Sequence, residues 1–181
     1  LNTRGDVVIE SSTEDDLAMF EFTIPSNVGD ATIDGFEVAI QHAFSDTGFG
    51  VSVNATVVDS NRKYDNADLS SQFAIEGVSD SANVIGYYEN EQFSIRAAYN
   101  WRDKFYAGKN SNGGVDYPIY TDAYGQVDIN MSYNVNDKLQ MFFEAINITD
   151  EYQRQHSRHE RMLVNLRQLA PRYNVGLRYT F

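Results

Sequence analysis

Residues 171–181 read Pro-Arg-Tyr-Asn-Val-Gly-Leu-Arg-Tyr-Thr-Phe, and their side chains alternate between apolar and polar. Successive side chains of a β-strand point to opposite faces, so this stretch predicts a strand with one face for an apolar medium and one for water. The apolar face carries Tyr173, Val175, Leu177, Tyr179 and Phe181. A membrane-spanning strand and a strand of a soluble sandwich both show such alternation, so its recurrence along the chain decides between them.

The same alternation recurs at residues 49–57, 93–102 and 126–135. Each run is close to the ~9–11 residues that a tilted strand needs to cross a bilayer. Ordinary globular strands are shorter, at roughly 5–6 residues. The length of the runs therefore favours a membrane barrel.

Charged side chains on the polar faces of these runs support the same interpretation. They are Arg96, Arg102, Asp128, Arg172 and Arg178. Facing hydrocarbon near the bilayer midplane would cost each of them roughly 2–4 kcal/mol, so they must face water or a polar interior. A helical membrane protein would need about 20 consecutive apolar residues, and the sequence contains no such run. The fold class predicted is all-β, with antiparallel transmembrane strands.

Short and long connections alternate along the chain. We predict seven strands, at residues 31–44, 49–60, 82–90, 93–103, 123–135, 139–149 and 171–181. Long polar connections lie at residues 61–81, 104–122 and 150–170. Outer-membrane barrels have short periplasmic turns and long external loops, so we expect the long connections outside the cell. Residues 1–30 are then an external loop region that completes an upstream hairpin.

Composition argues against several classes of function. Lys and Arg number 14 against 26 Asp and Glu, and this acidic balance argues against a nucleic-acid partner. There is no cysteine, no Gly-Xaa-Ser-Xaa-Gly elbow and no HExxH sequence, so we predict neither an enzyme nor a cofactor. His156 and His159 could be read as a metal pair, but Arg154, Arg158 and Arg161 surround them and their charge opposes a cation. We expect these histidines in a solvated external loop and predict no metal site.

Four stretches carry a family resemblance, in the order in which the family has them. Residues 25–37 resemble the PxNxxxAxxxGxE stretch of TonB-dependent outer-membrane receptors, and residues 99–103 resemble their YxYRD sequence. The stretch Asn147-Ile-Thr-Asp150-Glu-Tyr152 is similar to the NLTDxxY signature of the penultimate strand. The end Tyr179-Thr-Phe181 resembles the aromatic terminus that the barrel-assembly machinery reads.

The resemblance implies a fold, a location and partners. Residues 31–181 would be the seven C-terminal strands of a barrel of about 22 strands in the bacterial outer membrane. The plug domain and the TonB box of such receptors are absent from this sequence, so we expect the native chain to begin upstream of Leu1. The implied partners are the TonB complex, through that N-terminal plug, the barrel-assembly machinery, through the terminal strand, outer-membrane lipid and a small-molecule ligand.

The implied function is energy-coupled uptake of a scarce, bulky nutrient: a siderophore, a cobalamin-like chelate or an oligosaccharide. Ligand contacts in such receptors come partly from external loops. The aromatic candidates here are Tyr106, Tyr117 and Tyr120, whose rings can stack on a sugar or an aromatic chelate. The cationic candidates are Arg102, Lys104 and Lys109, which can attract an anion.

Two alternatives stay open at the level of sequence. If residues 17–24 form an eighth strand, the chain could close as a self-contained small barrel of the adhesin or structural type, with a filled interior. The other alternative is a secreted β-sandwich binding module, which predicts shorter strands packed in two layers.

Overall fold

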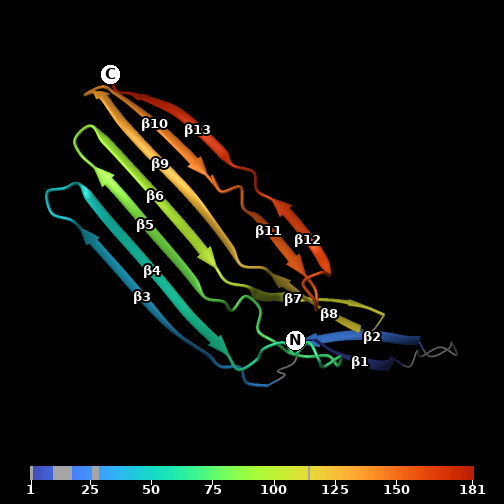
Figure 1. Cartoon of the computed structure of the whole chain (residues 1–181). Coiled ribbons are helices and arrows are strands. Elements are labelled where there is room, and N and C mark those ends of the chain that lie inside the picture. Colours follow the sequence, from blue (N-terminus) through green and yellow to red (C-terminus); the bar gives the residue numbers. More distant parts are fainter. Residues whose placement is uncertain (1, 10–17, 26–28, 114) are drawn as a thin grey trace. The chain divides into compact units, whose positions relative to one another are not determined.

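The computed structural model describes residues 2–9, 18–25, 29–113 and 115–181 (Figure 1). Within these ranges the chain forms thirteen strands, which belong to three sheets. It divides into two units, residues 1–31 and residues 32–181. Among the described residues, no helix is long and apolar enough to cross a membrane.

The first unit contains two antiparallel strands, β1 (Asn2–Ile9) and β2 (Ala18–Pro25). Both lie in the region that the sequence assigned to an external loop. β2 coincides with the segment considered as an eighth strand of a small barrel. It pairs with β1 in a two-stranded sheet of its own, however, so the described residues form no closed eight-stranded barrel.

The second unit is built on a seven-stranded sheet whose strands follow one another in chain order (Figure 1). They are β3 (Ile33–Ala43), β4 (Phe49–Ser60), β5 (Ser81–Glu89), β6 (Phe93–Arg102), β9 (Tyr124–Asn136), β10 (Leu139–Ile146) and β13 (Arg172–Tyr179). Every neighbouring pair is antiparallel. These are the seven strands predicted from sequence, so that prediction is confirmed.

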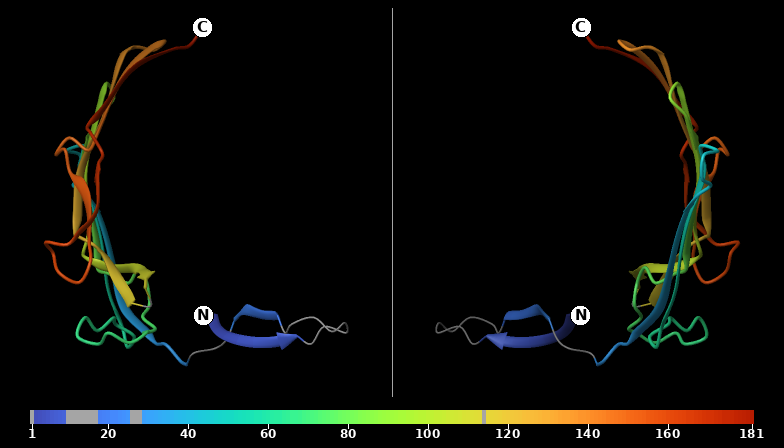
Figure 2. Two further views of the ribbon diagram at one scale, coloured as in Figure 1. Left: turned by 90° about the vertical axis from the view of Figure 1, so that its right-hand side faces the viewer. Right: turned by 90° about the vertical axis from the view of Figure 1, so that its left-hand side faces the viewer.

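The seven strands form a single curved layer (Figure 2). A β-sandwich would divide them between two packed sheets, so the sandwich alternative does not describe this unit. The sheet ends at β3 on one side and at β13 on the other. An open sheet edge in hydrocarbon leaves backbone groups unsatisfied, so the sheet has the architecture of a part of a barrel wall.

The register gives the sheet one continuous apolar face. Ile40, Val53, Val84, Tyr99 and Val127 lie directly opposite one another on five successive strands. These side chains are not packed into a core: Ile40 is 59% exposed and Val84 is 40% exposed. Apolar side chains in such a row remain exposed to solvent unless lipid covers them, as it does on the outer face of a membrane barrel.

The opposite face is polar, and hydrogen bonds connect its side chains. Asn54, Asn83, Asn100 and Gln126 form a second row across β4, β5, β6 and β9. Asn83 donates to Asn100, and Gln126 Nε2 donates to Asp128 Oδ1 at 2.9 Å. In a closed barrel this face lines the interior, which accommodates the charges that the sequence placed there.

Aromatic rings cover glycines on neighbouring strands of this sheet. A Cβ at Gly50 would lie 2.0 Å from Tyr87 Cζ, and one at Gly176 would lie 2.0 Å from Phe142 Cζ. Gly50 is directly opposite Tyr87, and Gly176 is directly opposite Phe142. A ring that lies over a glycine of the next strand is a known means of fixing strand register.

Two segments predicted as long loops contain strands instead. Residues 104–122 include β7 (Phe105–Asn112) and β8 (Val115–Thr121), and residues 150–170 include β11 (Tyr152–His156) and β12 (Leu163–Gln168). These four strands form one sheet in the order β12-β11-β8-β7. The two hairpins pair with each other through Gln155 and Thr121 and through His156 and Tyr120. Pairing between segments distant in sequence thus stabilises strands that local patterns did not indicate.

β10 ends at Ile146, earlier than predicted, because the chain turns at Asn147. This residue has a φ of 55° and is 2% exposed. Its side-chain amide donates to the carbonyl oxygens of Glu151, at 3.0 Å, and of Leu169. Its own backbone N–H donates to Asp128 Oδ1 at 2.9 Å. The asparagine of the NITD stretch therefore connects β9, this turn and the segment that precedes β13.

Candidate functional site

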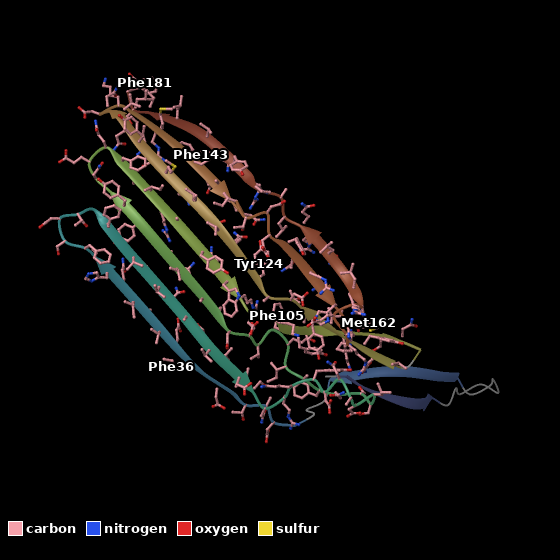
Figure 3. All side chains as sticks on the ribbon, in the orientation of Figure 1. Phe36, Phe105, Tyr124, Phe143, Met162 and Phe181 are labelled. Carbon is pink, nitrogen blue, oxygen red and sulfur yellow. The ribbon has the colours of Figure 1, made fainter. Side chains whose placement is uncertain are left out.

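The candidate site lies at the junction where β6 and β9 end and the smaller sheet begins. β6 ends at Arg102 and β7 begins at Phe105, which is labelled at this junction in Figure 3. Between the two strands, the N–H of Lys104 donates to Asp103 Oδ1 at 2.7 Å. On the return path β8 ends at Thr121 and β9 begins at Tyr124. The hairpin β7–β8 therefore continues the pair β6–β9 after a short interruption.

Residues 61–80 fold back onto this junction without forming a strand or a helix. We call them the 61–80 segment. The N–H of Gly77 donates to the carbonyl oxygen of Tyr106 at 2.8 Å, and the N–H of Asp103 donates to that of Asp80 at 2.9 Å. The segment is thereby fixed to the ends of β6 and β7.

Aromatic rings from three separate connections meet at the junction. Tyr64 of the 61–80 segment stacks on Tyr106 of β7, with ring centroids 5.1 Å apart. Tyr106 contacts Tyr120 of β8 edge-on at 5.9 Å, and Tyr120 stacks on His156 of β11 at 5.4 Å. We call these four residues the aromatic row. Contacts of this geometry stabilise aromatic pairs beyond the area that they bury.

A pocket of ≈ 520 Å³ opens beside the aromatic row. Tyr64, Tyr106 and Tyr120 contribute to its lining. Three cationic side chains (Arg62, Lys63 and Lys104) and three carboxylates (Asp59, Asp80 and Asp103) also line it. The charges in the pocket therefore balance, although the chain as a whole has a net charge of −12. Its size is in the range of ligand-binding clefts in proteins.

Two phenols of the row, those of Tyr106 and Tyr120, are held in their neutral form. Burial raises the pKa of Tyr106 to about 12, and the negative charge of Glu76 adds to this effect. Burial also raises the pKa of Tyr120, although the hydrogen bond that its hydroxyl donates to Asn66 Oδ1, at 3.0 Å, opposes the shift. Neutral phenol rings present flat apolar faces, which suit stacking on a sugar ring or a planar chelate.

The three predicted cationic residues are placed differently. Lys109 Nζ is 2.5 Å from Asp116 Oδ2, and this pairing holds the pKa of the Asp116 carboxyl below its usual range. Arg102 donates to Ser79 Oγ at 2.8 Å and to Gly77 O at 2.5 Å, so it holds the 61–80 segment. Lys104 lines the pocket, and its Nζ lies 6.0 Å from the centroid of the Tyr120 ring. In the part of the chain that the structure describes, the Lys104 ammonium has no ion pair.

The three predicted tyrosines do not form one group. Tyr106 and Tyr120 are directly opposite each other and both line the pocket. Tyr117 lies three residues before Tyr120 on the same strand, so its side chain projects from the opposite face of β8. It is 39% exposed and does not line the pocket.

Sequence reasoning did not find the role of His156, which was expected in a solvated loop. That expectation is wrong, because His156 is 2% exposed. Its Nδ1 donates to the carbonyl oxygen of Ser157 at 2.6 Å. Its Nε2 is 3.1 Å from Asp122 Oδ1, without the angle of a hydrogen bond. Asp122 also pairs with Arg154 at 2.6 Å, and that contact joins the two external hairpins.

Tyr64 was not predicted either, because a single tyrosine in a polar connection carries no local signal. His156 likewise has no sequence pattern around it that would indicate burial. Among the described residues, no group of three or more His, Cys, Asp or Glu side chains is arranged to hold a metal ion. The site is a pocket with aromatic side chains in its wall.

Comparison with known proteins assigns the family. Residues 2–148 match the family model described as TonB dependent receptor-like, beta-barrel. No curated protein matches the chain. Among solved structures, the siderophore receptor PiuA from Acinetobacter baumannii has the same fold, with a TM-score of 0.60 at 18% sequence identity. That match covers 84% of this chain and 22% of the PiuA chain. The chain therefore belongs to the TonB-dependent receptor β-barrel family, which comprises receptors and transporters rather than enzymes.

Proposed function

We propose that this chain forms the C-terminal part of the barrel of a receptor that imports a scarce, bulky nutrient across the bacterial outer membrane. A ferric siderophore, a cobalamin-like chelate and an oligosaccharide are the candidate nutrients. Residues 31–181 supply barrel strands, and the remaining strands and the plug belong to the rest of the receptor. This division is supported by the edge strands β3 and β13, which pair with no further strand among the described residues, and by the 22% share of the solved receptor that the chain covers. Energy coupling would reach the barrel through TonB and the plug.

The observation that carries the proposal is the pocket beside the aromatic row. All the long connections of the seven-stranded sheet leave from the end at which this pocket lies: 61–80, 103–123 and 147–171. The opposite end has only the short connections 44–48, 90–92 and 137–138. Long loops are the external ones in outer-membrane barrels, so the pocket faces the medium from which a nutrient arrives.

Within the pocket we propose that Tyr106, Tyr120 and Lys104 contact the ligand. The two rings provide stacking surfaces, and the Lys104 ammonium attracts an anionic group of the ligand. Arg102 supports the pocket through its hydrogen bond to Gly77 of the 61–80 segment. Lys109 supports it through a hydrogen bond to Ser71 of the same segment and an ion pair with Asp116 of β8. Tyr117 would contact lipid headgroups or solvent on the outer side of the hairpin.

Uptake by cells tests the proposal. A strain that lacks the receptor gene is complemented with the full-length gene and supplied with labelled ferric siderophores, cobalamin and oligosaccharides. We expect receptor-dependent uptake of one of these classes. Lys104→Gln should weaken uptake of an anionic chelate and spare that of a neutral sugar, whereas Lys138→Gln, in a short turn at the opposite end, should change neither. If no member of the panel depends on the receptor, import of these nutrients is not its function.

We further propose that the terminal strand is the signal for barrel assembly, as its aromatic end suggests. Tyr173, Val175, Leu177 and Tyr179 share the apolar face of β13, and Phe181 beyond them is fully exposed. Deletion of Phe181 should lower the amount of heat-modifiable, folded receptor in outer-membrane fractions. A normal amount of folded receptor after the deletion would remove Phe181 from the signal.

A further inference from the structure

Arg158, in the turn between β11 and β12, contacts two other parts of the external region. One terminal nitrogen, Nη1, donates to the carbonyl oxygen of Asn66 at 2.5 Å and lies 3.5 Å from that of Asp68. The other, Nη2, donates to the carbonyl oxygen of Asp116 at 2.9 Å and contacts the Tyr64 hydroxyl at 3.3 Å. One guanidinium thus connects the first half of the 61–80 segment to β8.

The same guanidinium stabilises the position of an aromatic ring in the pocket wall. Its carbon Cζ lies 5.8 Å from the centroid of the Tyr64 ring, within the range of a cation–π contact. Tyr64 in turn stacks on Tyr106. Without Arg158, Tyr64 would retain this stacking contact but lose the hydrogen bond and the charge that fix its direction.

The second half of the 61–80 segment has an independent attachment. Arg102 donates to Gly77 O and Ser79 Oγ, and its guanidinium covers the Phe105 ring at 4.0 Å. The two halves are therefore held by two different arginines. Removing one of them should loosen the half that it contacts and leave the attachments of the other half in place; without Arg158, the first half keeps the hydrogen bond from the Tyr120 hydroxyl to Asn66.

We infer that Arg158 is a positioning residue of the candidate site: it holds Tyr64 and residues 66–68 against β8, and so keeps the wall of the pocket in its binding-competent form. This inference rests on the proposed function and adds a residue to its site. The planar guanidinium supplies the divergent donors that this arrangement uses, whereas a lysine ammonium is a single point charge. Lysine at position 158 should therefore restore the attachment only in part.

A spin label on the 61–80 segment measures the attachment directly. The printed sequence has no cysteine, and Leu69 is 68% exposed, so Leu69→Cys gives a label site next to the residues that Arg158 holds. The full-length receptor, with any other cysteines replaced, is labelled and reconstituted in lipid vesicles. We expect a restricted label in this background, a mobile one with Arg158→Gln and an intermediate one with Arg158→Lys.

Arg161→Gln is the matched control. It removes the same charge from the same turn, and the Arg161 side chain has no hydrogen bond or ion pair with any residue that the structure describes. Tyr64→Phe is a second, milder variant that removes only the hydroxyl contacted by Arg158, and it should raise label mobility slightly. An unchanged label in both Arg158→Gln and Tyr64→Phe, or an equal change in Arg161→Gln, would overturn the inference.

Uptake separates positioning from mere support of the fold. If Arg158→Gln leaves about a tenth of the receptors in the binding-competent form, the apparent Kd of the imported panel member rises about tenfold while the maximal rate stays the same. Heat-modifiable, folded receptor should remain at its normal level. Unchanged affinity despite a mobile label would overturn the positioning role. Failure of the unmodified receptor to import any panel member would overturn the proposed function, and the label experiment does not depend on that result.

Discussion

Asn147 shows at the scale of one residue why a family motif has its particular side chain. Its positive φ favours glycine or asparagine, and only asparagine also offers both donors and an acceptor. The amide donors reach Glu151 O and Leu169 O, and Oδ1 accepts the N–H of Glu151 at 3.0 Å. The short NITD stretch therefore determines how the chain leaves β10 and where the segments before β11 and β13 lie.

Replacing Asn147 tests this account. Asn147→Gly keeps the backbone conformation but removes the side-chain hydrogen bonds to Glu151 and Leu169, which costs about 0.5–1.5 kcal/mol for each bond. Asn147→Ala should destabilise the receptor more, because it adds strain at a positive φ. The measurement is the urea midpoint of the receptor folded in lipid.

Asn136→Ala is the control for Asn147. Asn136 Oδ1 also caps a turn, accepting the N–H groups of Lys138 and Leu139 at 3.0 Å, but that turn is exposed. Its loss should cost clearly less than the loss of Asn147. Equal urea midpoints for Asn136→Ala and Asn147→Ala would show that the hydrogen bonds of Asn147 contribute little to the stability of the receptor.

Single residues also show which parts of the candidate site could be predicted from the sequence and which could not. Tyr106, Tyr120 and Lys104 were candidates because of their residue types, and the structure places all three at one pocket. Tyr117 has the same residue type as Tyr120, but its side chain lies on the other face of β8. The partners of Arg158 lie more than 40 residues away in sequence, so no local pattern could reveal them.

At the scale of elements, strict alternation was a reliable signal where strands pair without interruption. It was lost in β7, because the register shifts between Tyr106 and Gly108 and an extra residue breaks the period of two. β12 shows no alternation: its apolar residues Leu163, Val164 and Leu166 fall on both faces. The external hairpins were therefore read as loops, although cross-strand pairing makes them a sheet.

Two glycines of neighbouring strands provide a matched test of how the sheet fixes its register. Gly50→Ala would place a Cβ against the Tyr87 ring and force the ring to move, which typically costs about 1–3 kcal/mol. Gly86→Ala meets nothing within 4 Å, so it should be neutral or slightly stabilising. Urea midpoints of the two variants give the comparison. A Gly50→Ala receptor as stable as the Gly86→Ala receptor would show that the ring does not need the glycine.

At the scale of the whole molecule, the difference between the two faces of the seven-stranded sheet is the main reason to describe it as part of a barrel wall. The polar face carries hydrogen-bonded side chains, including those of Asn83, Asn100 and Asp128. The apolar face is continuous from β3 to β13, and among the described residues of the second unit no protein layer covers it. This division was predictable because a period of two in sequence fixes the face of every side chain. The ligand could not be predicted from the sequence, since the pocket combines residues from separate connections.

The most direct test of the account is a charge placed on either face at adjacent positions of β6. Ala97 lies opposite Gly86 and Ile129 on the apolar face, and Ala98 lies opposite Ile85 and Asp128 on the polar face. Ala97→Arg should cost roughly 2–4 kcal/mol in lipid and reduce the amount of folded receptor in the outer membrane. Ala98→Arg, which points into the interior beside a carboxylate, should assemble normally. Equal assembly of the two variants, or a greater loss with Ala98→Arg, would contradict the assignment of the apolar face to lipid and with it the barrel-wall account.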